Sequence, residues 1–272
     1  MSYPEDSGEA AIVKFCVLAS SSSGNCTFIG TDRTRILVDA GLSRKETFQR
    51  LIDIGEKPDD LTGIVITHEH SDHVCGLLSI ARYFQRLGRP LPLYLSRLTA
   101  PTIDWGEFTP VVEHFQAGSS FPIGDIQVDT FTIPHDAIDP VGVGVRANGI
   151  KISVVTDLGY MPDSVKVHVR GSDLLMLEAN HDLDMLKVGP YPWSVKQRVM
   201  GRRGHLSNDV ACDFIRKELD STVSTLILGH LSENNNHPEI VRLVATQALE
   251  GRLLFTKLVV ANGRKPSEWF VY

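Results

Sequence analysis

The chain has 272 residues, of which 42% are hydrophobic and 22% charged, and its formal net charge is −6. This length and composition suit a globular fold with a sizeable buried core. The negative charge argues against a protein that coats nucleic acid through bulk charge, although a local basic patch is compatible with it.

The chain begins with an acidic, polar stretch, and we expect residues 1–10 to form a disordered tail before a single domain over residues 11–272. This start has no basic or apolar signal segment, and no stretch reaches the ~20 apolar residues that span a bilayer. The cysteines form no C-x-x-C pair and are expected to be buried, reduced thiols: Cys16, Cys26, Cys75 and Cys212. These features predict a cytoplasmic protein without membrane contact.

Short runs rich in Val and Ile predict strands over residues 12–19, 26–30 and 35–39. The Ser20–Asn25 loop between the first two is either a flexible turn or a nest of backbone N–H groups for an anion. Ser43, with Glu46 three residues later, predicts a capping box at the start of a helix.

A buried strand is predicted over residues 61–67, followed by a helix over 74–87 that ends at Gly88. Further strands are predicted over residues 93–95, 111–116, 126–133, 141–147 and 151–156. Strands over 174–177, 226–228 and 257–260 then alternate with helices over 208–219 and 238–249. This order favours one layered domain with helices outside packed sheets.

The predicted strand over residues 61–67 leads into Thr67-His68-Glu69-His70-Ser71-Asp72-His73, which has the pattern H-x-H-x-D-H. Residues two apart in an extended chain point the same way, so His68 and His70 can bind one ion together. Asp72 and His73 face a neighbouring point. Imidazole and carboxylate ligands suit Zn, Mn or Fe rather than Ca. The pattern arises by chance in about one sequence per thousand of this length, which disfavours a solvated polar loop.

This motif resembles that of the metallo-β-lactamase superfamily, and the superfamily's other motifs follow in order. Asp39, within Ile36–Gly41, resembles an aspartate that supports the metal loop without binding metal. His135, Asp157 and His230 each follow an apolar strand and match the third, fourth and fifth motifs.

The resemblance implies an α+β fold, a four-layer αββα sandwich in which two mixed sheets are flanked by helices. It also implies two divalent metal ions, Zn, Mn or Fe. In the implied arrangement one ion is held by His68, His70 and His135, the other by Asp72, His73 and His230, and Asp157 bridges the two.

Two further residues resemble a pair found in the nuclease branches of the superfamily. Glu178 ends a predicted strand, and His205 precedes a predicted helix. The resemblance implies that His205 protonates the leaving oxygen while Glu178 holds its ring and raises its basicity. The alternative for this segment is a helix-start loop with Ser207 as its cap.

Residues 191–203 lead directly into His205 and are rich in cationic and aromatic side chains. Lys and Arg bind phosphates, and Trp or Tyr can stack on a frayed base. The alternative is a solvated helix face. We therefore list as candidate substrate contacts Tyr191, Trp193, Lys196, Arg198, Arg202 and Arg203. His181 is a further candidate phosphate contact, or a helix-start histidine without a role.

Together with Glu178–Asp182 and Asn234–Asn236, these motifs resemble the bacterial YycJ/WalJ group over nearly the whole chain after residue 12. The group implies a two-metal DNA exonuclease that digests double-stranded DNA from the 5′ end. In the mechanism that we expect, Asp72 orients the nucleophile. Unlike in larger RNA-processing relatives, no long insert separates Glu178 from His205. The alternatives are a hydrolase of a small substrate, such as a cyclic nucleotide phosphodiester or a lactone, and a di-iron redox or sensor protein.

Overall fold

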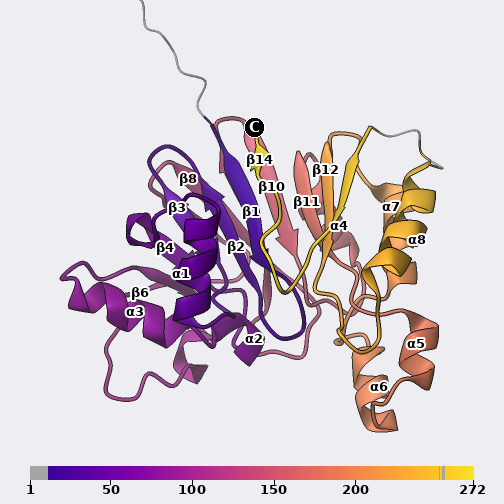
Figure 1. Ribbon diagram of the computed structural model, residues 1–272, viewed down its shortest axis with the longest axis horizontal. Helices are drawn as coiled ribbons and strands as arrows, with labels where there is room; N and C mark the ends of the chain where they lie inside the picture. The colour runs from indigo at the N-terminus through magenta and orange to yellow at the C-terminus, as the bar shows by residue number, and fades with distance from the viewer. Residues whose placement is uncertain (1–11, 251, 253–254) are drawn as a thin grey trace, which may run out of the picture.

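Two seven-stranded sheets lie face to face, and helices cover their outer faces (Figure 1). The computed structural model describes residues 12–250, 252 and 255–272. The αββα sandwich predicted from the sequence is confirmed. The predicted tail, residues 1–10, lies outside the described residues, and the single domain stays a prediction.

Each sheet combines an antiparallel part with a parallel part. The first sheet has the order β14 (Phe270–Val271), β1 (Lys14–Ala19), β2 (Cys26–Gly30), β3 (Arg35–Val38), β4 (Gly63–Val65), β5 (Leu93–Ser96) and β6 (Val112–Phe115). The second has the order β13 (Lys257–Val260), β12 (Thr225–Gly229), β11 (Leu174–Glu178), β10 (Ile150–Val155), β9 (Val141–Ala147), β8 (Ile126–Thr132) and β7 (Ser120–Ile123). Every predicted strand is present, whereas β7 and β14 were not predicted.

The helices are α1 (Arg44–Asp53), α2 (Ser71–Val74), α3 (Leu77–Arg86), α4 (Asp163–Val169), α5 (Leu183–Val188), α6 (Trp193–Val199), α7 (Asn208–Glu218) and α8 (Pro238–Glu250). Ser43 caps α1 by accepting from the Glu46 amide at 3.2 Å, while the Glu46 carboxylate turns to Arg50 instead of closing a capping box. Helix α4 was not predicted, and helices at α5 and α6 were considered only as alternatives to substrate contacts.

The helix predicted over residues 74–87 is present as α3, but it begins at Leu77, because the chain breaks between α2 and α3 around Cys75 and Gly76. A Cβ at Gly76 would lie 1.9 Å from the Leu42 carbonyl oxygen, so the break brings the backbone against the loop after β3. The prediction that all four cysteines are buried is wrong for Cys75, whose side chain is exposed next to this break. Its Sγ donates to the Gly41 carbonyl at 3.1 Å.

Apolar side chains fill all three spaces between the four layers. Val17, Val38 and Val143 belong to the core between the sheets. Leu51, Ile80 and Phe84 pack α1 and α3 on the first sheet, and a third core packs α4, α7 and α8 on the second. Among the described residues no helix is long and apolar enough to cross a membrane.

The topology brings the carboxyl ends of β3 and β4 to the same edge as those of β10, β11 and β12. The edge is closed where the Val141 amide of the second sheet donates to the Thr67 carbonyl of the first at 3.1 Å. Polar residues that follow these strands therefore converge on one place, as ligand sites do at the carboxyl ends of parallel strands.

Candidate metal centre and catalytic pair

The predicted metal ligands meet at this shared edge. The ligand atoms of His68, His70 and His135 all lie within 4.8 Å of one another, and those of Asp72, His73 and His230 form a second such group. Asp157 lies between the groups, because it clusters with His68 and His73 on one side and with His230 on the other. The structure thus brings all seven side chains together.

The donor atoms of the first group converge on a single point. His70 Nδ1 lies 3.1 Å from His68 Nε2 and 3.2 Å from His135 Nε2. Asp157 Oδ2 is buried and has no hydrogen-bond partner among the described residues. Buried imidazole nitrogens aimed at one another, beside an unpartnered carboxylate oxygen, are the donor set of a divalent cation such as Zn, Mn or Fe. These residues fit a two-metal centre.

Support from the first sheet comes from Asp39, which directly follows β3. Its carboxylate accepts from the Thr67 amide at 2.9 Å and from His73 Nδ1 at 2.8 Å. This bond turns His73 Nε2 toward the centre, where it lies 3.3 Å from Asp157 Oδ2. Burial opposes the His73 cation, but the charges of Asp39 and Asp157 raise the pKa of His73 well above its ordinary value. Through these hydrogen bonds Asp39 can hold the metal loop in place, as the sequence predicted.

Asn25 is a second supporting residue, and the sequence did not reveal it. Its Nδ2 donates to Asp72 Oδ2 at 3.2 Å and to the Ser21 carbonyl at 2.9 Å, while its backbone N–H donates to the Asp72 carbonyl at 2.8 Å. The anion nest considered for this loop is not formed, because the amides of Ser21, Ser23 and Asn25 donate to protein oxygens. The asparagine at the end of a serine-rich turn was the available clue.

The close approach of this loop to the metal motif depends on Gly41. A Cβ at Gly41 would lie 1.7 Å from the Asp72 carbonyl oxygen, which no side chain can tolerate. Gly41 also donates its amide to the Asn25 carbonyl at 2.8 Å. Only glycine at this position lets the two loops lie backbone to backbone.

Glu178, at the end of β11, is fully buried and holds two histidines at once. Its Oε1 accepts from His205 Nδ1 and from His230 Nδ1, both at 2.8 Å, and its Oε2 accepts from the amides of Leu158 and Leu206 at 3.0 Å. Burial raises the pKa of Glu178, but the charges and hydrogen bonds of the two histidines lower it to about 2. The sequence paired Glu178 with His205, and its hydrogen bond to His230 is a finding of the structure.

His205 is the partner that reaches solvent. Its side chain is 23% exposed, and its Nδ1 lies 3.7 Å from Asp157 Oδ1. Burial disfavours the cation, but the charge and hydrogen bond of Glu178 raise the pKa of His205 above its ordinary value. Most of the centre is closed to solvent, and of its ligands only His70 and Asp72 are partly exposed. A substrate therefore meets the centre beside His70, Asp72 and His205.

Three residues of this edge have a left-handed backbone. Asp39, Asp157 and His230 have φ values of 65°, 63° and 56°, which are uncommon outside glycine. Each is the residue at which a strand turns into the centre. The His230 backbone is held by two bonds, because its amide donates to Ser20 Oγ at 2.7 Å and its carbonyl accepts from Asn180 Nδ2 at 2.8 Å. Strain of this kind is common at functional sites.

The predicted substrate contacts lie on or next to α5 and α6, which adjoin the centre. Arg198 pairs with Asp136, and the Arg203 Nε donates to the His135 carbonyl at 3.1 Å. Arg202 lies over the Tyr160 ring, with its guanidinium carbon 4.1 Å from the ring centroid. Trp193 is 63% exposed.

Three other candidates are placed less favourably for DNA. Lys196 is buried, and its Nζ donates to the Lys187 carbonyl at 2.7 Å. Tyr191 accepts from Asn234 Nδ2 at 3.3 Å through its hydroxyl. His181 is 1% exposed, and burial lowers its pKa to about 4. The hydrogen bond of Lys196 stabilises the fold, and His181 Nδ1 is buried without a hydrogen-bond partner among the described residues. Substrate binding by either residue stays a prediction.

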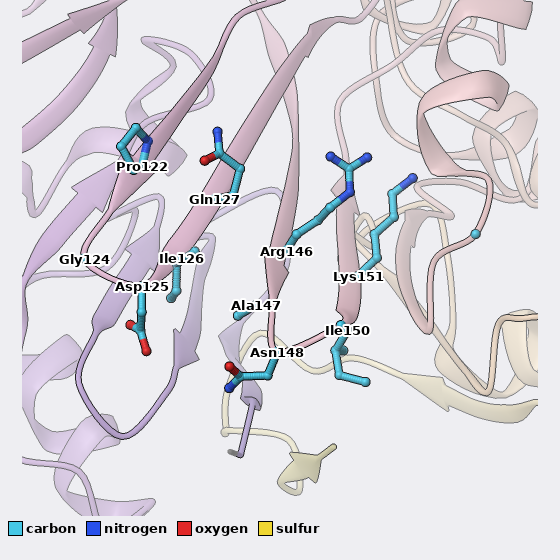
Figure 2. A pocket seen from close by; sticks show the side chains of 12 residues that line it. Pro122, Gly124, Asp125, Ile126, Gln127, Arg146, Ala147, Asn148, Ile150 and Lys151 are labelled. Atoms are coloured by element: carbon cyan, nitrogen blue, oxygen red, sulfur yellow. The ribbon is translucent and has the colours of Figure 1, made fainter. Parts of the chain in front are cut away.

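A separate hollow of about 560 Å³ lies at the opposite end of β10 (Figure 2). Arg146 and Lys151 lie side by side in it on paired strands, but Arg146 is bound to Asp129 and Lys151 donates to the carbonyls of His168 and Arg170. By strand rise, Lys151 is roughly 20 Å from Asp157. This hollow takes no part in the metal centre.

The fold and the centre together define a metal-dependent hydrolase whose clustered histidines and aspartates fit a two-metal site. The family model described as the beta-lactamase superfamily domain matches residues 34–230, and the chain belongs to the metallo-β-lactamase superfamily. It is 36% identical over 244 residues to Exodeoxyribonuclease YycJ of Bacillus anthracis, an alignment that covers 87% of this chain and 89% of that protein. It is 34% identical over 241 residues to Exodeoxyribonuclease WalJ of Streptococcus pneumoniae, covering 87% and 88%.

Among solved structures, the metallo-beta-lactamase fold protein YhfI from Bacillus subtilis superposes with a TM-score of 0.76 at 15% identity. The superposition covers 96% of this chain and 100% of YhfI. At this identity the likeness shows the shared fold.

Proposed function

We propose that this protein is a DNA exonuclease that uses two divalent cations, Zn, Mn or Fe, and digests double-stranded DNA from the 5′ end. The observation that carries the proposal is the His205–Glu178 pair beside the metal ligands, because hydrolysis of a phosphodiester needs a proton donor for a poor leaving group. The two exodeoxyribonuclease relatives support the substrate class. The polarity is proposed from the resemblance of the sequence motifs to the YycJ/WalJ group.

The proposed ligand sets are His68, His70 and His135 for one cation and Asp72, His73 and His230 for the other, with Asp157 between them. Two cations held there supply an activated water and neutralise charge on the phosphate. Asp72, fixed by Asn25, orients the nucleophile. His205 gives its proton to the departing 3′-oxygen, so the product carries a 5′-phosphate.

The Glu178 carboxylate keeps His205 protonated until the leaving oxygen takes the proton. It occupies His205 Nδ1 and so leaves Nε2 as the donor to substrate. Arg198, Arg202, Arg203 and the exposed Trp193 form the proposed DNA contacts, with Tyr191 as an aromatic neighbour. We also propose the cytoplasm as the compartment, in keeping with four free thiols.

Product mapping on linear duplexes labelled at either the 5′ or the 3′ end tests the proposal, with a generic aryl phosphodiester in parallel. We expect early release of the 5′ label as a mononucleotide, complete loss of activity on chelation, and recovery on adding Zn, Mn or Fe. An enzyme that cleaves the aryl ester but ignores every DNA substrate would instead be a hydrolase of small molecules, and the proposal would be wrong.

A further inference from the structure

The α5–α6 segment (residues 183–203) carries two strongly exposed apolar side chains beside the catalytic centre. Figure 1 shows α5 and α6 projecting beyond the ends of the sheets, on the same side of the molecule as α2. Val188, at the end of α5, is 86% exposed, and Trp193, at the start of α6, is 63% exposed. Two apolar side chains held in solvent, on a segment that leads directly to His205, are available to bind a substrate.

The connection between the two helices is stiff and fixed to the body of the protein. It contains Pro190 and Pro192, whose rings fix the backbone. A Cβ at Gly189 would lie 2.3 Å from Asn235 Oδ1, so this turn packs closely on the loop after His230. The Asp182 amide, just before α5, donates to the Asn235 carbonyl at 2.9 Å. The two exposed side chains at the ends of this connection, Val188 and Trp193, which we call the tip, are therefore held in a fixed position.

The tip also has a defined position relative to His205, the proposed proton donor. The last residue of α6, Val199, accepts from the His205 amide at 2.9 Å. With a rise of 1.5 Å per residue, Trp193 lies about 9 Å further along the helix axis. Stacked bases are about 3.4 Å apart, so this separation corresponds to two or three nucleotides.

The surroundings of the tip favour a polyanion over a second protein. Residues 183–203 contain five basic side chains and one acidic side chain in a chain whose net charge is −6. Lys187 and Arg198 are paired with carboxylates and Lys196 is buried, whereas Arg202 and Arg203 have no carboxylate partner among the described residues. The catalytic centre is recessed, since His68, His73 and Asp157 are all buried. A strand that has left the duplex enters such a recess more readily than a paired one.

On the proposed nuclease function, we infer that the tip formed by Val188 and Trp193 is a wedge that unstacks the terminal base pairs of duplex DNA. Trp193 takes the place of the displaced partner base, Val188 fills the gap beside it, and the freed strand passes along α6 to His205. Apolar wedges inserted between base steps are an established way of unstacking DNA, and base–aromatic stacking repays part of the cost.

The experiment compares Trp193→Ala with the parent enzyme on a blunt duplex and on the same duplex with its three terminal pairs mismatched. We expect kcat/KM on the blunt duplex to fall about tenfold, the effect of one lost base–aromatic stack. On the frayed duplex, where the strands are already apart, we expect a loss at least threefold smaller. Leu243→Ala, at a residue on α8 that is 60% exposed, is the matched control and should leave the ratio of the two rates unchanged.

An equal loss on both duplexes would make Trp193 a plain binding contact, and no loss on either would remove it from substrate binding; both results overturn the wedge. If the parent enzyme cleaves neither duplex, the nuclease proposal fails with it, so the two failures are distinguishable. Thermal unfolding of Trp193→Ala should match that of the parent, because this side chain packs against little.

A binding measurement gives a second readout. With 2-aminopurine at the end of the strand that is freed, we expect fluorescence to rise when the slow His205→Ala holoenzyme binds, because this base leaves the stack and Trp193 takes its place. The double variant His205→Ala/Trp193→Ala should bind the duplex without this rise. An equal rise in both would contradict the wedge even if the kinetic ratio changed.

Discussion

The two sheets contribute to the metal centre in different ways. The first sheet supplies four of the seven proposed ligands from one continuous segment that follows β4 and runs into α2: His68, His70, Asp72 and His73. The second sheet supplies the other three singly, His135 after β8, Asp157 after β10 and His230 after β12, and adds the His205–Glu178 pair.

The residues that hydrogen-bond to the proposed ligands also differ between the two sheets. In the first sheet, two side chains divide the support, because Asp39 fixes His73 and Asn25 fixes Asp72 while also lying 3.2 Å from His73 Nε2. In the second, the single Glu178 carboxylate holds both His205 and His230. A substitution of Asp39 or Asn25 should therefore weaken metal binding alone. A substitution of Glu178 should weaken both metal binding and proton transfer.

The largest effect is expected where the contributions of the two sheets meet. Asp157→Ala removes the one proposed ligand that clusters with both groups, so hydrolysis should be abolished and metal content should fall. Metal analysis of the purified variant and its activity on duplex DNA measure both. Asp163→Ala, at a 97% exposed carboxylate at the start of α4, is the control. Retention of both metals with full activity would refute a bridging role.

The next effect tests the catalytic pair of the second sheet. His205→Ala should slow turnover by ~10²–10⁴-fold while metal content stays intact, because a proton donor is lost and no ligand is removed. His114→Ala, at an exposed histidine on β6, is the control. An unchanged rate on DNA would remove His205 from the acid role.

The pH profile sharpens this test. Because Glu178 raises the pKa of His205, the acid form persists at neutral pH, and the rate should decline as pH rises through that pKa. Glu178→Gln removes the raising charge and leaves the burial that lowers the pKa, so the alkaline limb should move to lower pH. The same variant should also weaken metal binding through His230. A shift of the limb without any loss of metal affinity would show that Glu178 serves His205 alone.

The contrast between the sheets also explains what could be predicted from the sequence. His68, His70, Asp72 and His73 are adjacent in the chain, and their spacing alone indicates ligands. His135, Asp157 and His230 were found only through their order after apolar strands and a family resemblance, since no local pattern links them. Strand positions followed from apolar runs, because burial between layers demands such runs.

What the sequence could not provide depends on contacts between distant segments. Asn25 meets Asp72 across 47 positions, and Glu178 meets His230 across 52. The break between α2 and α3 was missed because its cause, the Leu42 carbonyl against Gly76, lies in another loop. Lys196 was interpreted as a phosphate contact from its charge alone, yet its ammonium is held by the carbonyl of Lys187.

The smallest effect is expected for support in the first sheet. Asp39→Ala leaves every proposed ligand in place but removes the acceptor that orients His73, and losses of this kind lower metal affinity by about 10–100-fold. Titration of the metal-free variant with Zn or Mn should show this loss, while saturating metal should restore most of kcat because Glu178 and His205 are untouched. Asp125→Ala is the matched control, since Asp125 also accepts from threonine hydroxyls but lies away from the centre. If kcat stayed low at saturating metal, Asp39 would also affect proton donation by His205. The supporting residues of the two sheets would then not have separate roles.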